Sequence, residues 1–188
     1  DGKKVLQSVY VQTFLAGEES KCLLKPPVDI EDAGEYQEPD IARVTGELVE
    51  KYAKETDFFV FAQVGGPISM LNEMYPMEDY MVNCITYPEE THILTEKVIA
   101  FEIKKAKLFL DKGADAILIA DDMAFNTGVF LPPYVMEENV YPFYKQMIRE
   151  IKAYKNIPVF LHSDGNLNSV MDDLVECGFD GIQSLQPS

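Results

Sequence analysis

The sequence is poor in basic residues and in cysteine, and each scarcity excludes a class of protein. Sixteen Lys and Arg stand against 32 Asp and Glu, which gives a net charge of −16. Because nucleic acids and anionic membranes are polyanions, this balance argues against both as partners. The cysteines Cys22, Cys84 and Cys177 are odd in number and form no CxxC pair. We therefore expect reduced thiols of a cytoplasmic protein rather than a disulfide framework.

Long apolar runs are also missing. No segment approaches the roughly 18–20 apolar residues that cross a bilayer, and no signal peptide is visible. The sequence begins with Asp1 rather than Met, so we expect an internal fragment. Its 188 residues, 47% of them hydrophobic, are sufficient for one domain with a core.

Helical and strand patterns alternate through most of the chain. Helical spacing of apolar residues predicts helices over 39–56, with Asp40 as N-cap, and over 88–112, 136–154 and 166–177. Apolar runs predict strands over 58–64, 115–120, 158–162 and 181–185. The run 58–64 is almost continuously apolar, which is typical of a strand buried on both faces.

Residues 1–38 differ from the rest and are predicted to form an extended entry segment. They contain β-prone runs at 5–12 and 22–25, followed by an acidic loop that we expect to be solvated.

Strands that alternate with helices predict an α/β fold with parallel strands and right-handed crossovers. A doubly wound sheet and a (β/α)8 barrel both fit this pattern. Four strands cannot close an eight-stranded barrel, and the last predicted strand stands at the end of the sequence. We therefore expect residues 1–188 to be one domain that is either part of a barrel or an open sheet.

Polar residues collect directly after the predicted strands. In sequence order they are Gln63, Gly65, Gly66, Asp121, Asp122, His162, Asp164, Asn166 and Gln183. Ligands of parallel α/β folds bind where the carboxyl ends of the strands meet. This edge is therefore the predicted functional site.

His162 and Asp164 are two residues apart, so in an extended chain their side chains point the same way. Such a pair can bind a divalent metal with a third ligand from elsewhere, or can act as an acid/base pair. Alternatively, Asp164 caps the following helix. Asp121 and Asp122 are adjacent and should point opposite ways, so at most one faces the site directly. Two close carboxylates could also divide acid and base roles.

The turn Gly65-Gly66-Pro67 lets the backbone approach a ligand, but it matches neither GxGxxG nor a P-loop. It therefore does not predict a nucleotide site. The Met- and Tyr-rich stretch 70–81, which includes Tyr75, is more typical of core than of a ligand pocket.

Four motifs together resemble those of the uroporphyrinogen decarboxylase superfamily. In order they are Val64 to Pro67, Gly113 to Asp122, Val159 to Asn166 and Gly178 to Pro187. The resemblance implies a (β/α)8 barrel, of which this chain holds only part. It also implies one of two activities. These are decarboxylation of uroporphyrinogen without a cofactor, and methyl transfer between a corrinoid and a thiol or another acceptor, usually with zinc.

The stretch His162 to Asn166 is similar to the His-x-Cys-Gly-Asn motif of the methyltransferases, with Asp164 in place of the cysteine. An aspartate can ligate zinc, although the site is then harder than one with a thiolate. The resemblance favours the methyltransferase-like branch, with a corrinoid that is the substrate or is carried by a partner protein. In that reading His162 and Asp164 hold the metal.

The remaining strand-end residues receive roles in the same reading. The residues expected to orient the substrate during catalysis are Asp121, Asp122 and Gln183. Those expected to contact it are Gln63, Gly65, Gly66, Tyr75 and Asn166. The alternatives are a metal-free tetrapyrrole decarboxylase, disfavoured by the few basic residues at the strand ends, and a non-catalytic corrinoid or tetrapyrrole-binding protein. A homodimer is the expected assembly.

Overall fold

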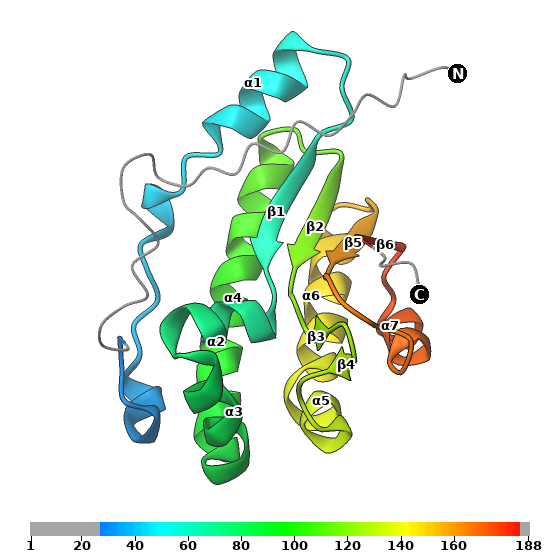
Figure 1. The fold of residues 1–188 in the computed structure, drawn as a ribbon. Coiled ribbons are helices and arrows are strands. Elements are labelled where there is room, and N and C mark those ends of the chain that lie inside the picture. Colours follow the sequence, from blue (N-terminus) through cyan, green and yellow to red (C-terminus); the bar gives the residue numbers. More distant parts are fainter. Residues whose placement is uncertain (1–26, 185–188) are drawn as a thin grey trace.

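Four parallel strands form the centre of the structure, a computed structural model that describes residues 27–184 (Figure 1). They are β1 (Phe61–Gly65), β2 (Ala116–Ala120), β5 (Val159–His162) and β6 (Gly181–Gln183), in the spatial order β1-β2-β5-β6. Each strand pairs in parallel with the strand before it, so the carboxyl ends meet at one edge. The β-prone runs predicted at 5–12 and 22–25 lie outside the described residues.

Long helices cover one face of this sheet. Helices α4 (Pro88–Asp111) and α6 (Tyr141–Tyr154) lie behind the strands in Figure 1. The strand residues that point to this side are buried: Ala62, Val64, Ile117, Ile119, Val159 and Leu161. A strand order that follows the chain, with helices on one face, is the arrangement of a barrel wall. A doubly wound sheet would reverse its order and carry helices on both faces.

The prediction of a strand buried on both faces was wrong for 58–64. Strand β1 begins only at Phe61, and its residues alternate between exposed and buried. Phe61 is 48% exposed and Phe59 46%. Their rings contact each other, with centroids 5.0 Å apart. The apolar run is continuous because one set of side chains packs under the helices and the other lies on the opposite, open face.

The predicted helix over 39–56 is divided in two. A short 3-10 helix η2 (Ile41–Arg43) is capped by Asp40, whose Oδ1 accepts a hydrogen bond from the Ala42 amide at 3.0 Å. Gly46, at φ 60°, then interrupts the helical backbone before α1 (Glu47–Glu55). The acidic loop expected to be solvated contains a 3-10 helix, η1 (Ile30–Glu35), which buries Ala33 against the core.

Two other predicted helices also differ from the structure. The helix over 136–154 is two helices, α5 (Pro133–Asn139) and α6, which meet at Val140. The helix over 166–177 begins later, as α7 (Met171–Cys177). The helix over 88–112 is confirmed as α4, and Gly113 follows it at φ 102°, which suits a residue without a side chain.

Further elements gather at the carboxyl edge of the sheet, the lower end of Figure 1. They are α2 (Pro67–Met74), α3 (Met77–Thr86) and a hairpin of β3 (Ala124–Phe125) and β4 (Gly128–Val129). Tyr75 and Tyr80 are buried, and Met70, Met74 and Met81 pack against the core as predicted, whereas Met77 is 37% exposed. Within residues 27–184, no helix combines the length and apolar character needed to cross a membrane.

Candidate active site

Three potential metal ligands converge at the carboxyl edge of the sheet. Asp122 follows β2, His162 ends β5, and Asp164 stands two residues further on. Taking one ligand atom from each residue, all three atoms lie within 4.8 Å of one another. We call these residues the Asp–His–Asp cluster. The structure thus brings together the predicted pair His162 and Asp164 with a third group, Asp122, which had been predicted only to orient substrate.

The neighbouring strand orients the imidazole of this cluster. His162 is paired in register with Gln183 of β6, and its Nδ1 bonds the Gln183 Oε1. An amide oxygen can only accept, so the hydrogen is on Nδ1. Nε2, on the other side of the ring, lies 3.9 Å from Asp122 Oδ1. This is the usual arrangement of a ligating histidine, whose second nitrogen donates to a fixed acceptor. Gln183 therefore acts on the site through His162.

The two aspartates after β2 have different environments. Asp121 is fully buried, whereas the side chain of Asp122 is 60% exposed. The Asp122 Oδ1 accepts a hydrogen bond from the Asp164 amide at 3.0 Å, which ties the loops after β2 and β5 together. This is the opposed orientation that adjacent positions on an extended chain predict.

Asp121 holds the beginning of α2. Its carboxylate accepts hydrogen bonds from the amides of Ile68 and Ser69, at 3.3 and 2.5 Å, and from the Tyr144 hydroxyl. Burial raises the pKa of Asp121 to about 6, against the opposing effect of these donors. An aspartate surrounded by protein donors in this way stabilises the fold around the site.

Ser69 connects the two aspartates. Its amide donates to Asp121, and its Oγ accepts from the amide of Asp122 at 3.1 Å. The position of α2 and the backbone of Asp122 are therefore coupled. Sequence analysis missed Ser69 and Tyr144 because neither follows a strand directly.

The turn Gly65-Gly66-Pro67 approaches protein side chains closely. A Cβ on Gly66 would lie 2.4 Å from the Cγ of Asp121. The amide of Gly65 donates to Oε2 of Glu102 at 2.7 Å, and the buried Glu102 also pairs with Lys105. A Cβ on Gly65 would lie 2.1 Å from the Met70 Sδ, so both glycines have a structural reason at this position. Their predicted substrate contact stays a prediction.

The other predicted contact residues are dispersed. Tyr75 is buried, and its hydroxyl donates to the carbonyl of Val28 at 2.7 Å, so the structure does not bring it to the cluster. The backbone amide of Asn166 donates to the carbonyl oxygen of Phe125, and the Asn166 side-chain Oδ1 accepts from the backbone amide of Asn168. Gln63 lies on the open face of β1, opposite Leu118 in register.

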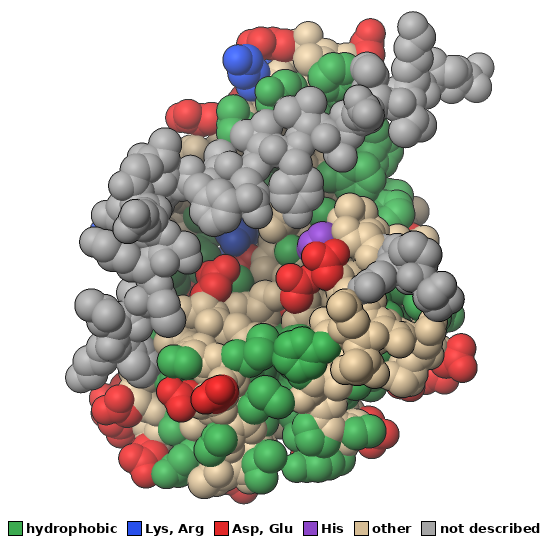
Figure 2. All heavy atoms as spheres, in the orientation of Figure 1, with side chains coloured by type: hydrophobic (Ala, Val, Ile, Leu, Met, Phe, Trp, Pro, Cys, Tyr) green, Lys and Arg blue, Asp and Glu red, His purple; other side chains and the backbone are tan. Residues whose placement is uncertain are grey.

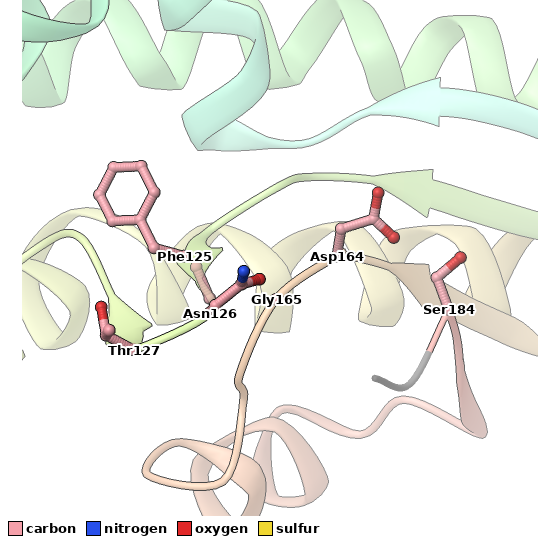
Figure 3. A pocket seen from close by; sticks show the side chains of 7 residues that line it. Phe125, Asn126, Thr127, Asp164, Gly165 and Ser184 are labelled. Carbon is pink, nitrogen blue, oxygen red and sulfur yellow. The ribbon is translucent and has the colours of Figure 1, made fainter. Parts of the chain in front are cut away.

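A pocket of about 780 Å³ opens beside Asp164 (Figure 3). Its lining residues are Ala124, Phe125, Asn126, Thr127, Asp164, Gly165 and Ser184. Figure 3 shows Phe125, Asn126 and Thr127 at one end and Asp164 with Ser184 at the other. The first group belongs to the β3–β4 hairpin, which sequence analysis did not predict.

The hairpin is joined closely to the loop after β5. The amide of Met123 donates to Ser163 Oγ at 3.1 Å. Gly165, at φ 88°, lets the two backbones meet, because a Cβ there would lie 2.3 Å from Ala124 O. The pocket and the cluster therefore share one set of supports.

Comparison with known proteins gives this site a context. The family model described as uroporphyrinogen decarboxylase (URO-D) matches residues 14–184. The methylcobamide:CoM methyltransferase MtaA of Methanosarcina barkeri is 25% identical over 130 residues, which are 67% of this chain and 35% of the relative. The same enzyme from M. barkeri strain Fusaro gives the same figures. The chain thus spans about a third of these relatives.

The solved structure of a methyltransferase from Methanosarcina mazei superposes with a TM-score of 0.62 at 20% identity. The superposed part is 73% of this chain and 40% of the M. mazei chain. The predicted fold, part of a uroporphyrinogen decarboxylase-type barrel, is confirmed, and so is the predicted resemblance to that superfamily.

Proposed function

The chain belongs to the uroporphyrinogen decarboxylase family, and from that membership we propose that it carries the metal site of a methyltransferase. The methyl group would move between a corrinoid, free or carried by a partner protein, and a small acceptor. The observation that carries the proposal is the Asp–His–Asp cluster at the carboxyl edge of the sheet. The names of the matched relatives, methylcobamide:CoM methyltransferases, support the class of reaction.

The residues of the cluster fit a divalent first-row metal. Zinc binds imidazole nitrogen and carboxylate oxygen at roughly 2.0–2.2 Å, so ligand atoms already within 4.8 Å of one another need only a small closure. Cys84 and Cys177 are both buried in the hydrophobic core. The described ligands are therefore oxygen and nitrogen, and the site is harder than one with a thiolate.

Each residue of the site has a definite task. A bound metal supplies Lewis acidity, which lowers the pKa of an acceptor or polarises the leaving group of the methyl donor. Asp122, His162 and Asp164 would bind it, and Gln183 holds the His162 ring through Nδ1, which leaves Nε2 on the side of Asp122. Asp121 holds the adjacent loop in place.

The test is the metal content of the full-length protein after dialysis, followed by methyl transfer from methylcobalamin to a small thiol. We expect one metal per chain, lost in Asp122→Ala, His162→Ala and Asp164→Ala, with transfer lost in parallel. Asp172→Ala is the matched control, because it removes an exposed carboxylate from α7.

The outcomes separate the alternatives. A wild-type protein without metal would remove the metal-assisted mechanism. Release of carbon dioxide from uroporphyrinogen would then identify a decarboxylase. Tight corrinoid binding without turnover would identify a binding protein.

A further inference from the structure

We propose that the pocket beside the Asp–His–Asp cluster takes a small ligand that carries no negative charge apart from the atom that would bind the metal. This inference rests on the proposed function, since the ligand is the partner in methyl transfer. It follows from where the acidic and basic side chains of the described residues lie.

The described part of the pocket wall offers no positive charge. Asp164 is its one ionisable residue, and the exposed carboxylate of Asp122 is adjacent. The other polar side chains, Asn126, Thr127 and Ser184, are neutral hydrogen-bonding groups, and Phe125 adds an aromatic ring that is 52% exposed. A divalent metal would balance the two carboxylates and leave no surplus positive charge to pair with an anion.

The basic residues lie elsewhere. Every Lys and Arg between residues 27 and 184 belongs to η2, α1, α4 or α6, or is the residue directly after α4 or α6. Six of these twelve residues form ion pairs, among them Lys104–Glu38, Lys107–Glu150, Lys112–Glu50 and Lys152–Asp180. In Figure 2 red carboxylates lie directly beside the purple histidine, while the nearest visible blue side chain is separated from it by other atoms and has a red group next to it.

Between residues 27 and 184, Lys105 is linked through Glu102 to the carboxyl end of β1, and it is already neutralised. Its Nζ lies 2.7 Å from Oε2 of the buried Glu102, the same atom that accepts from the Gly65 amide. Pairing Lys105 with an anionic ligand would leave Glu102 buried and short of its partner, which is costly. The excess of acidic residues over the whole chain adds a further long-range repulsion of anions.

The experiment compares small thiols that share a two-carbon chain and differ in their terminal group. Full-length protein loaded with Co²⁺ is titrated with 2-mercaptoethanol, cysteamine and 2-mercaptoethanesulfonate, and thiolate coordination is followed in the Co²⁺ absorption spectrum. We expect the neutral and cationic thiols to bind at least about tenfold more tightly than the sulfonate. Added salt should strengthen sulfonate binding by screening the repulsion and leave 2-mercaptoethanol unchanged.

A charge inserted into the pocket provides a second arm. Thr127→Lys places a cation on the exposed hairpin turn that lines the pocket. Val175→Lys adds the same charge on an exposed position of α7, away from the pocket lining. We expect Thr127→Lys to tighten sulfonate binding about fivefold relative to Val175→Lys, because Thr127 lines the pocket and Val175 does not, and salt screens more distant charges.

Tighter binding of the sulfonate than of 2-mercaptoethanol by the wild type would overturn the inference and leave the proposed metal site standing. Equal effects of the two lysine substitutions would also count against it. Failure to bind Co²⁺ would remove the proposed function, and this inference with it.

Discussion

Removing the Tyr144 hydroxyl tests whether Asp121 is a structural anchor. The hydroxyl donates to a carboxylate that is fully buried, and Tyr144 is itself buried. In Tyr144→Phe the ring is retained and a single donor is lost. A hydrogen bond to a charged group contributes about 1.5–3 kcal/mol, and one between neutral groups about 0.5–1.5 kcal/mol. We expect a loss of unfolding free energy of about 2 kcal/mol at pH 8.

The loss should depend on pH in a definite direction. Burial raises the pKa of Asp121 from 3.8 to about 6. The contribution of a group with a raised pKa is fully present below its unfolded pKa and is lost as the pH rises through its folded pKa. The Tyr144 hydroxyl opposes this shift, so its removal raises the pKa further and increases the loss above pH 6. The difference between pH 5 and pH 8 should be about 1.4 kcal/mol, equivalent to one pKa unit.

The assay is urea denaturation at pH 5 and pH 8, with chelator present so that metal binding does not contribute. Tyr154→Phe is the matched control on the same helix, because Tyr154 is exposed and donates to the exposed Asp111. We expect it to cost less than about 0.5 kcal/mol at either pH. The reasoning would be refuted by equal losses for the two variants, or by a Tyr144→Phe loss that is the same at both pH values.

Three other predictions concern single positions. Gly66→Ala should lower the free energy of unfolding by about 1–3 kcal/mol, because the added Cβ would overlap the buried Asp121. Gly34→Ala is the control and should change it by less than about 0.5 kcal/mol, because a Cβ there meets no atom within 4 Å. Ser69→Ala should weaken metal binding about tenfold in a competition titration with unchanged circular dichroism, because it frees the backbone of a ligand; unchanged affinity would contradict this. Cys84 and Cys177 should resist alkylation at pH 8 until urea is added, as read by peptide mass spectrometry, because burial raises both pKa values to about 11; rapid native labelling would exclude that burial.

The alternation of strands and helices could be predicted because each signal is local. Strand β2 is a short apolar run between turn residues, and α4 keeps helical spacing over many turns. The predicted helix boundaries that were wrong depend on the backbone conformation of single residues, such as the left-handed Gly46 and the irregular Val140. The β3–β4 hairpin escaped detection because its strands have two residues each, too few for any periodicity.

The site, too, could be predicted only where its residues are close to one another in sequence. His162 and Asp164 could be paired because two positions along an extended chain share one side. Asp122 could not be assigned as the third ligand, because it lies 40 residues earlier and meets them only through strand pairing and the loop after β2. Tyr144 and Glu102 were missed for the same reason, since each acts on a strand end from a helix distant in sequence.

The adjacent aspartates show how the end of one strand can both stabilise the fold and offer a ligand to a metal. Because their side chains leave the backbone on opposite sides, Asp121 enters the core and bonds the amides of α2, while Asp122 turns to the exposed edge. The backbone amide of Asp122 is bonded to Ser69, whose own amide is bonded to Asp121. A movement of the buried carboxylate would therefore shift α2 and, through Ser69, the exposed one. The rigidity of the proposed metal ligand therefore originates in its buried neighbour. Tyr144→Phe should weaken metal binding as well as the fold, although the Tyr144 hydroxyl donates to Asp121, which is outside the Asp–His–Asp cluster.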